Sequence, residues 1–497
     1  MTQEFDVAIV GLGPVGAALA NLLGQAGVSV VAFERDAEVY PLPRAVHFDG
    51  EVMRIFHTMG LKAEVEAVTR PGLKPMEFVN AEGRVLLVRG GNAALGPHGC
   101  ANNHYFNQPQ LERTLRAGLR RFPAVHLKTR HEVFAIAEDG DGATLSVENC
   151  ANGELLHMRA RYVVGCDGAR SLVRRLMGSR NEDLGLHQPW LVFDALLKRD
   201  PGLPDHTVQY CDPQRPITYC NLRGERRRWE IMLMPGDDPV TIARPENVYR
   251  LLSRWISPED VDLERAVVYT FHSVITHGWR RGRLMIAGDS AHQTPPFLGQ
   301  GMCAGIRDAA NLAWKLALVL NGAADDSLLE TYESERLPHV RAFIELAVKL
   351  GDMIQTVDPE VAAERDRRLA AGDPEVITFP APGLGPGVRE DAAAPVGQPF
   401  PQPPLADGHL LDNALGGQFG LIGRAKLLGT ADEATRQRLR ETRVVELDDR
   451  HPALRDWLDA HDAGAVLLRP DRYVAGVARD AAGLERLAAL LPHLRAA

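Results

Sequence analysis

The first thirty-five residues alternate between apolar runs and small residues, and this pattern predicts a βαβ unit. Residues 5–10 and 28–33 are mostly apolar and rich in β-branched side chains, as expected for buried parallel strands. The small residues of 17–26 lie between them and predict a helix. The second run ends at Glu34. An acidic residue therefore stands at the carboxyl end of the second predicted strand.

Glycines occupy the turn between the first strand and the helix. Gly11, Gly13 and Gly16 have the spacing G-x-G-x-x-G. The first glycine permits a tight turn, the second lets a pyrophosphate approach the backbone, and the third lets helix and strand pack closely. Glu34 suits the hydroxyls of a ribose. The motif predicts a dinucleotide site, with three ordinary turn glycines as the alternative, and leaves open whether NAD(P) or FAD binds.

Two later segments repeat the pattern of a strand that ends in a carboxylate and a glycine. The strand at 162–166 is followed by Asp167-Gly168, and the strand at 283–287 by Gly288-Asp289. Carboxyl ends of strands are where open α/β sheets bind ligands. A proline- and glycine-rich loop and helices at 303–320 and 328–350 follow, and the loop leads into a helix N-terminus that suits an anion or carbonyl.

Other parts of the chain have the shorter period of antiparallel strands. Residues 76–88 form two runs around Asn80-Ala-Glu-Gly83, a hairpin signal, and 183–270 holds short strands separated by Pro, Gly and Asp. We therefore predict one discontinuous α/β domain (1–75, 100–182 and 271–355) and an antiparallel-sheet domain (76–99 and 183–270). A proline-rich linker (372–404) leads to a small α/β module (405–497).

Composition narrows the choice of partners. The net charge is −9 and no long basic run occurs, which argues against nucleic acid. Residues 7–33 carry no charged side chain, but glycines and Pro14 interrupt them and acids precede them, so we predict neither a membrane span nor a signal peptide. The six cysteines form no C-x-x-C pair and no cluster with histidines, which predicts reduced thiols, no metal site and a cytoplasmic protein.

The three motifs in this order resemble the FAD-dependent aromatic hydroxylases, the p-hydroxybenzoate hydroxylase-like flavoprotein monooxygenases. The likeness runs from residue 5 to about 345. The linker and the C-terminal module resemble the phenol-hydroxylase branch, and within it the hydroxylases of 3-(3-hydroxyphenyl)propionate. The stretches that carry this second likeness are Pro43–Ala45, Tyr210–Pro213, Gly299–Gly301, Leu411–Ala414 and Leu468–Tyr473.

The resemblance implies an α/β fold with a Rossmann-like FAD-binding domain, an inserted antiparallel-sheet substrate domain and a thioredoxin-like C-terminal module. That module has no cysteine and so no dithiol chemistry. The positions that match FAD-binding positions of the family are Gly11, Gly13, Pro14, Val15, Gly16, Glu34, Arg35, Arg44, Gln108, Asp167, Asp289, Pro296, Gly299, Gly301 and Met302. Cys303 departs from the family, which often has Asn there.

The reaction implied is hydroxylation of a phenol, ortho to its hydroxyl, through a flavin C4a-hydroperoxide, with NAD(P)H and O₂ as co-substrates and a homodimer as the assembly to test. His47 and Asp49 are candidates for the catalytic side, against a structural role. Tyr210, Arg215 and Tyr219 are candidates for substrate contact, because a carboxylated substrate needs an arginine or hydroxyl partner. Two alternatives stay open: oxygenation of a polycyclic natural product, and a flavin protein that only passes electrons or binds a ligand.

Overall fold

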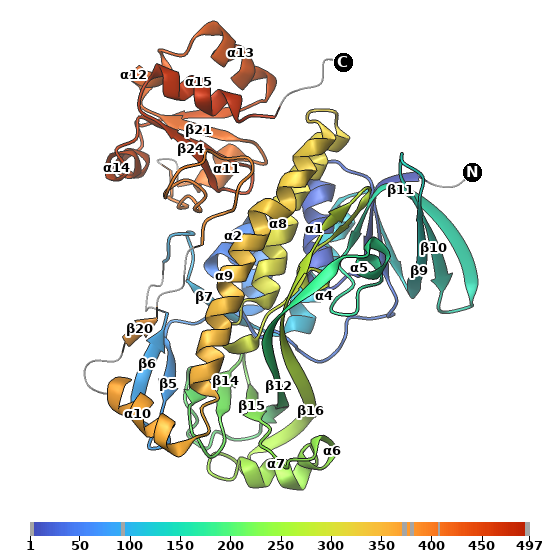
Figure 1. Cartoon of the computed structure of the whole chain (residues 1–497), viewed down its shortest axis with the longest axis vertical. Coiled ribbons are helices and arrows are strands. Elements are labelled where there is room, and N and C mark those ends of the chain that lie inside the picture. The colour runs from blue at the N-terminus through green and yellow to red at the C-terminus, as the bar shows by residue number, and fades with distance from the viewer. Residues whose placement is uncertain (1–3, 91–94, 370–374, 378–381, 406–407, 493–497) are drawn as a thin grey trace.

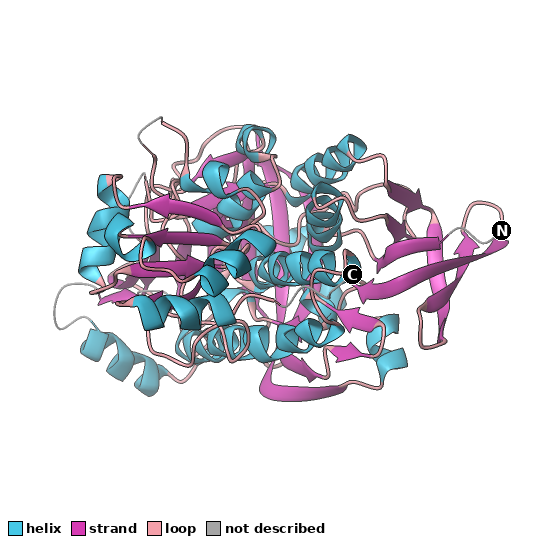
Figure 2. Ribbon diagram, turned by 90° about the horizontal axis from the view of Figure 1, so that it is seen from above, coloured by secondary structure: helices cyan, strands magenta, loops and turns pink. Residues whose placement is uncertain are grey.

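The computed structural model describes residues 4–90, 95–369, 375–377, 382–405 and 408–492. Figure 1 shows a parallel-sheet domain, an antiparallel-sheet domain below it, and a C-terminal module at the other end of two long central helices. Seen from above, most helices gather in the body of the molecule, and the hairpin strands near the N-terminus project beyond them (Figure 2). Within the described residues, no helix has the length and apolar character needed to cross a membrane.

The parallel-sheet domain is built on an eight-stranded sheet. Six strands follow one another as β17 (Arg280–Arg281), β18 (Leu284–Ile286), β11 (Glu154–Gly165), β1 (Glu4–Val10), β2 (Val30–Glu34) and β8 (Val125–Thr129). β1 is parallel to both β11 and β2, which confirms the βαβ prediction. The first half of β11 pairs in antiparallel fashion with β10 (Ala143–Asn149), which pairs with β9 (His131–Glu138).

Helices cover this sheet and form the core. They are α1 (Pro14–Gln25), α2 (Gly50–Thr58), α3 (Lys62–Ala67), α4 (Gln108–Gly118), α5 (Leu172–Met177), α8 (Gly301–Leu320) and α9 (Thr331–Ile354). α8 packs against α1 and is buried nearly all round, although it carries Arg307, Asp308, Asn311 and Lys315. Buried charges must be paired and buried amides must be hydrogen-bonded, so these four residues indicate where α8 meets polar partners.

The antiparallel-sheet domain has a nine-stranded sheet. Its order is β19 (His292–Gln293), β16 (Val261–His277), β12 (Arg180–Leu197), β15 (Arg226–Met232), β14 (Ile217–Asn221), β13 (Val208–Tyr210), β5 (Met76–Val79), β6 (Val85–Arg89) and β20 (Glu375–Ile377). α6 (Pro239–Ile242) and α7 (Pro245–Leu251) cover one face, and α10 (Pro359–Leu369) lies beside β6. A small sheet of β3 (His47–Asp49), β7 (Asn103–Phe106) and β4 (Thr69–Pro71) links the two domains.

Two boundaries differ from the sequence prediction. β12 and β16 are long strands that run from one domain into the other, so no sharp border exists at residues 183 or 270. Residues 375–377 form β20 and pair with β6, although the composition of 372–404 predicted only a linker. Residues 375–377 are a strand because they pair with the distant strand β6, and local composition does not indicate such a long-range pairing.

The C-terminal module has the strand order β22 (Val445–Asp448), β21 (Gly420–Gly423), β23 (Ala465–Leu468) and β24 (Val474–Ala478). β21 and β22 are parallel, and β23 and β24 are antiparallel. Its helices are α11 (Leu411–Leu415), α12 (Ala425–Leu428), α13 (Glu433–Glu441), α14 (Pro452–Ala460) and α15 (Ala481–Ala489). This is the expected thioredoxin-like arrangement, and α14 is an element that the sequence did not predict.

Candidate active site

The three glycine-containing motifs meet at one edge of the parallel sheet. Gly11 has a φ of +94°, and a Cβ there would lie 2.5 Å from the carbonyl oxygen of Cys166, next to Asp167. A Cβ on Gly288 would lie 2.9 Å from a methyl group of Val15. Both contacts leave no room for a side chain. The sequence could align these motifs only one after another, and the fold brings them together.

The N-terminus of α1 faces an open space. Gly13 is its N-cap, and a Cβ added there would meet no atom within 4 Å. A Cβ on Gly16 would lie 2.1 Å from the Gly11 carbonyl oxygen. Gly16 therefore serves the packing of helix against strand. Gly13 leaves space before a helix end whose N–H groups and dipole attract anions.

Glu34 closes the side of this turn. Its carboxylate accepts a hydrogen bond from the Leu12 backbone N–H at 3.1 Å. Arg116 of α4 lies 3.4 Å from the same carboxylate and donates to the Leu12 carbonyl oxygen at 3.1 Å. The neighbouring Arg35 is exposed. The acid is thus fixed beside the glycine turn, as the motif predicts.

Asp167 has its hydrogen bonds inside the protein. Its carboxylate accepts from the backbone N–H groups of Leu172 at 2.6 Å and Val173 at 3.2 Å, which begin α5. Ser290 Oγ donates to the same carboxylate at 3.0 Å. Asp167 therefore joins the end of β11 to the segment that contains Asp289. These hydrogen bonds fix the Asp167-Gly168 turn between β11 and α5.

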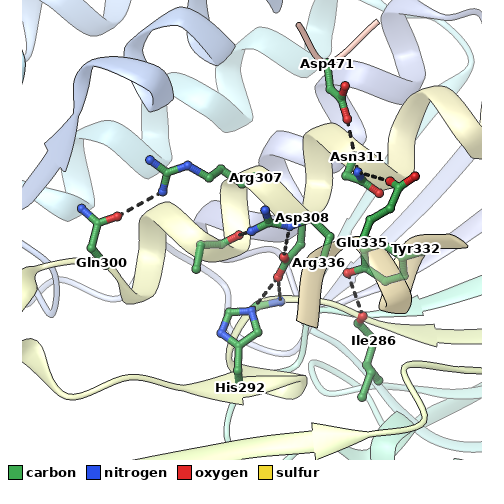
Figure 3. A network of polar contacts seen from close by, with 12 residues as sticks. Ile286, His292, Gln300, Arg307, Asp308, Asn311, Tyr332, Glu335, Arg336 and Asp471 are labelled. Atoms are coloured by element: carbon green, nitrogen blue, oxygen red, sulfur yellow. Dashed lines mark hydrogen bonds and ion pairs between the residues drawn. The ribbon is translucent and has the colours of Figure 1, made fainter. Parts of the chain in front are cut away.

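Asp289 projects from an anchored turn. Its side chain is exposed, whereas the backbone around it is held by Asp308 of α8. The Asp308 carboxylate accepts from Gly288 N–H at 3.1 Å, lies 2.6 Å from His292 Nε2 and accepts from Arg336 Nε at 2.9 Å (Figure 3). The result is an exposed carboxylate on a rigid support, at the same edge as the glycine turn.

Arg44 has a clamped backbone and an exposed side chain. Gln108 Oε1 accepts from the N–H groups of Arg44 at 2.9 Å and Ala45 at 2.6 Å. From the other domain, Arg228 donates to the Arg44 carbonyl oxygen at 2.7 Å and forms a buried ion pair with Asp194 at 2.7 Å. The loop is held from both sides, so the guanidinium of Arg44 is available to a ligand.

The loop from Pro295 to Gly301 is bordered by three side chains. It bends at Gly299, whose φ is +63°, and a Cβ there would lie 3.0 Å from His47 Nδ1. Arg89 donates to the Phe297 carbonyl oxygen at 3.0 Å. The Tyr105 ring lies edge-on to the His47 ring, with 5.7 Å between centroids. The loop is therefore bordered by an imidazole and a guanidinium, and a phenol lies behind the imidazole.

His47 and Asp49 differ in their protonation. His47 Nε2 lies 2.9 Å from Asn103 Oδ1, which only accepts, so Nε2 carries the proton and Nδ1 has a lone pair. The pKa of His47 is lowered to about 4, mainly by burial and next by the nearby positive charge of Arg89. Burial raises the pKa of Asp49, but the ion pair with Arg307 at 2.5 Å outweighs this and brings it to about 2. His47 is neutral, and Asp49 is an ionised cap on α2.

Comparisons with known proteins point to one family. A family model described as an FAD binding domain matches residues 4–347, and one described as the HcaD C-terminal domain matches 424–493. The chain is 38% identical to a probable NADH-specific resorcinol 4-hydroxylase of Rhodococcus jostii, over 98% of this chain and 94% of the relative. It is 36% identical to 3-(3-hydroxy-phenyl)propionate/3-hydroxycinnamic acid hydroxylase 2 of Burkholderia vietnamiensis, over 96% and 94%.

The chain belongs to the FAD-dependent aromatic hydroxylases. Solved structures agree in fold. The flavin-dependent monooxygenase PieE, in complex with FAD and substrate, is similar with a TM-score of 0.83 and 22% identity, over 98% of both chains. Aklavinone-11 hydroxylase, in complex with FAD and aklavinone, is similar with a TM-score of 0.81 and 23% identity, over 99% of both. Membership of this family supports the aromatic-hydroxylase prediction over the alternative of a flavin protein that only passes electrons or binds a ligand.

The site of the hydroxylase fits FAD by its own chemistry. The open space before α1 accepts a pyrophosphate, and Glu34 accepts hydrogen bonds from a ribose. Buried polar atoms without a hydrogen-bond partner among the described residues lie in or beside the loop, namely His47 Nδ1 and Thr294 Oγ1. Such atoms are rare in folded proteins unless a ligand or water meets them. Within the same residues, no group of three or more His, Cys, Asp or Glu is placed to hold a metal.

The predicted substrate contacts Tyr210 and Tyr219 lie on the face of the hydroxylase's antiparallel sheet that packs under α7. Tyr210 and Tyr219 belong to the apolar cluster under α7, where their hydroxyls bond to Trp255 Nε1 at 3.2 Å and the Pro204 carbonyl oxygen at 3.0 Å. Arg215 forms an ion pair with Asp237 at 2.6 Å. Side chains alternate along a strand, so the neighbours Gln209, Thr218 and Cys220 point the other way, toward Tyr105.

Two residues near the loop were not among the sequence-based candidates. Arg89 ends an apolar strand, and Tyr105 lies in the linking sheet. The sequence could have indicated Arg89, because it is a charged residue at the end of an apolar strand. No comparable pattern in the sequence indicated Tyr105. Cys303, which stands where relatives often have Asn, is buried with its thiol 3.6 Å from the Gly299 carbonyl oxygen. Burial raises the pKa of this thiol, so it stays protonated.

Proposed function

We propose that the hydroxylase adds a hydroxyl group to a small meta-substituted phenol, ortho to the existing hydroxyl, with 3-(3-hydroxyphenyl)propionate as the representative substrate. The observation that carries the proposal is that His47 and Arg89 lie against the loop at Gly299 and Phe297, with the Tyr105 ring edge-on to His47. A phenol that carries a carboxylate needs a hydrogen-bond acceptor at one end and a cation at the other. The name of the Burkholderia vietnamiensis relative supports this substrate.

The chain's own residues have separate tasks in this proposal. His47 Nδ1 accepts a hydrogen bond from the phenolic O–H, since its lone pair faces the loop and its Nε2 is fixed by Asn103. Arg89 stabilises negative charge on the substrate, because a charge pair interacts more strongly in a buried, low-dielectric environment than in water; burial also lowers the pKa of Arg89 itself, so the paired carboxylate helps to keep it charged. Asp49 serves as a support, since its carboxylate is ionised and bonded to Arg307. Bound FAD supplies hydride acceptance from NAD(P)H and the activation of O₂.

The proposed FAD site runs along the edge where the three motifs meet. The glycine turn, Glu34 and Arg35 hold the ADP end, Arg44 and Gln108 cover the middle, and Asp289 takes the ribityl hydroxyls or the pyrophosphate. Asp167 holds the turn between the two halves of the site. The residues beside the ring system are Pro296, Gly299, Gly301 and Met302, at the N-terminus of α8, where backbone N–H groups suit a flavin carbonyl.

Resorcinol is the second candidate, because the Rhodococcus jostii relative is named for it and is 38% identical. Resorcinol carries no carboxylate, so Arg89 distinguishes the two candidates. A polycyclic substrate rests only on structures less than 25% identical, which support the fold alone. The proposal also includes NADH or NADPH as reductant, a cytoplasmic location, a homodimer, and no nucleic acid or membrane partner.

The test uses purified protein loaded with FAD. NAD(P)H oxidation and O₂ uptake are measured with 3-(3-hydroxyphenyl)propionate, resorcinol, phenol and no substrate, each with NADH and with NADPH. The proposal expects the carboxylated phenol to give the largest kcat/KM and a catechol product. A larger kcat/KM with resorcinol would favour the second candidate. A protein that binds FAD and shows no phenol-stimulated oxidation would contradict the proposal.

A further inference from the structure

The C-terminal module has no cysteine and so no dithiol chemistry of its own. It makes several polar contacts with the helices that carry the site. Arg54 of α2 makes a buried two-pronged ion pair with Asp412, with both N–O distances 2.7 Å. Arg469 Nη2 lies 2.8 Å from Glu335 of α9. Asp471 accepts from Asn311 of α8 at 3.2 Å (Figure 3). These buried polar contacts fix the position of the module relative to α2, α8 and α9.

One residue of the module reaches further than the others. Tyr473 is buried, and its hydroxyl donates to Glu51 Oε1 of α2 at 2.6 Å. The other oxygen of Glu51 accepts from Arg307 Nε at 2.6 Å. Arg307 then donates to Gln300 Oε1 at 3.1 Å. Three contacts therefore join the module to Gln300, which immediately precedes α8 and ends the loop at Gly299.

The last part of this path is a closed ring of bonds. Arg307 Nη2 is 2.5 Å from Asp49 Oδ2, and Gln300 Nε2 donates to that same oxygen at 3.1 Å. Each of the three side chains thus bonds to the other two. The ring ties the start of α2 to the start of α8. A shift of Arg307 must move Gln300, and with it the loop beside His47.

Charge explains why Tyr473 matters to the ring. Glu51 and Asp49 are two partly buried acids that share the single guanidinium of Arg307. His98 and Asp49 also act on Glu51, and burial lowers the pKa of His98. Burial alone would raise the pKa of Glu51, whereas Arg307 and the Tyr473 hydroxyl lower it. Without that hydroxyl, Glu51 depends on Arg307 for more of its stabilisation. Arg307 is then drawn toward Glu51 and away from Gln300.

The face of α8 that receives the module supports the same role. Arg307, Asn311 and Trp314 are spaced four and three residues apart, so they lie along one stripe of the helix. Asn311 and Trp314 both donate to Asp471 at 3.2 Å, and Arg307 is connected to Tyr473 through Glu51. The segment 469–473 therefore lies along α8 up to its first turns. This is a direct mechanical path from the module to the loop.

We propose that the C-terminal module, through Tyr473, positions the 295–301 loop and so sets how tightly NAD(P)H oxidation is coupled to hydroxylation. In a coupled turnover, the two electrons of NAD(P)H leave one oxygen atom of O₂ in the ring hydroxyl and the other in water. In an uncoupled turnover, the same electrons and two protons convert O₂ to hydrogen peroxide. Tyr473 is a positioning residue, and the inference rests on the proposed function because it needs the loop to border the flavin.

The test measures hydrogen peroxide formed per NAD(P)H oxidised, at saturating substrate, for wild type and Tyr473→Phe. We expect the peroxide fraction to rise about threefold or more, because small misplacements near the reacting atoms are costly. Glu51→Gln keeps an acceptor for Tyr473 but weakens the bond to Arg307, which moves Arg307 the opposite way; because either shift of Arg307 displaces Gln300, this variant should raise the fraction too. It also carries the test if Tyr473→Phe does not fold. The double variant should show no additional rise.

The matched control is Tyr162→Phe, which removes a hydroxyl bonded to Asp326 far from the loop. This variant should form the same amount of hydrogen peroxide per NAD(P)H oxidised as the wild type. Equal peroxide fractions in wild type and Tyr473→Phe, or an equal rise in Tyr162→Phe, would overturn the proposal. If wild type hydroxylates no phenol, the proposed function fails instead. The visible spectrum of bound FAD then still tests the loop, with a shift expected in Tyr473→Phe and an unchanged spectrum counting against it.

Discussion

The two ends of the proposed FAD site are built in different ways. The ADP end consists of one continuous stretch, Gly11 to Glu34, in which backbone geometry does most of the work. The ring end is assembled from His47, Arg89, Tyr105 and the loop at Gly299, which come from four separate segments. The first end can be read from spacing alone. The second exists only after β6, β7 and α8 have been brought together.

The largest effect is expected at the glycine turn. Gly16→Val should destroy FAD binding and destabilise the fold, since even a Cβ would lie 2.1 Å from the Gly11 carbonyl oxygen. Gly13→Ala should keep the thermal midpoint of the apoprotein, because no atom lies within 4 Å of the added methyl group, and still lose flavin. Flavin absorbance per protein and melting curves check this. A Gly13→Ala protein that retains full flavin content would show that the ligand does not approach there.

A smaller effect is expected where the antiparallel sheet clamps the Arg44 loop. Asp194→Asn leaves Arg228 and Arg265 buried with a neutral partner, and such losses cost about 3 kcal/mol of unfolding free energy. Urea unfolding measures it. The control, Asp183→Asn, breaks an exposed pair with His187 and should cost less than about 1 kcal/mol. Equal costs for the two variants would refute the clamp.

The pH dependence of stability tests the environment of His47. Its pKa falls from 6.5 to about 4 on folding, so the unfolded chain binds the proton more readily between these values. This part of the stability is present above pH 6.5 and is lost as the pH falls toward 4. His47→Gln removes it, and the wild type should lose on the order of 3 kcal/mol relative to the variant across this window. Parallel stability curves would contradict the assignment.

The two faces of the antiparallel sheet give the smallest and most specific contrast. Arg89→Met should raise KM for 3-(3-hydroxyphenyl)propionate about tenfold and leave KM for resorcinol within about twofold, because only the first has a carboxylate to lose its cation. Tyr210→Phe should change neither KM, because its hydroxyl bonds to Trp255 on the far face. Steady-state kinetics with both substrates decide between the faces. A large change in Tyr210→Phe would restore the sequence-based prediction.

These contrasts explain how far the sequence could be read. The βαβ unit, the antiparallel inserts and a small α/β module at the C-terminus were predictable, since hydrophobic period and glycine spacing are local properties; the thioredoxin-like form of that module came from the family resemblance. Tyr210 and Tyr219 were predicted as substrate contacts because a carboxylated substrate needs an arginine or hydroxyl partner and both lie on the predicted sheet. Their strands were identified correctly, but a strand shows two faces, and the sequence did not say which face the flavin side would take. Strand β20 and the contact of Tyr473 with Glu51 depend on contacts between segments that are distant in the sequence, and residue spacing does not encode such contacts.

The central claim is that this site transfers oxygen to a phenol, and isotope labelling tests it most directly. FAD-loaded protein is incubated with NAD(P)H, 3-(3-hydroxyphenyl)propionate and labelled O₂, and the product is examined by mass spectrometry. The account predicts a catechol that carries one labelled oxygen atom per molecule, with the second atom in water. A catechol whose new oxygen comes from unlabelled water, or NAD(P)H oxidation that yields only hydrogen peroxide, would contradict it.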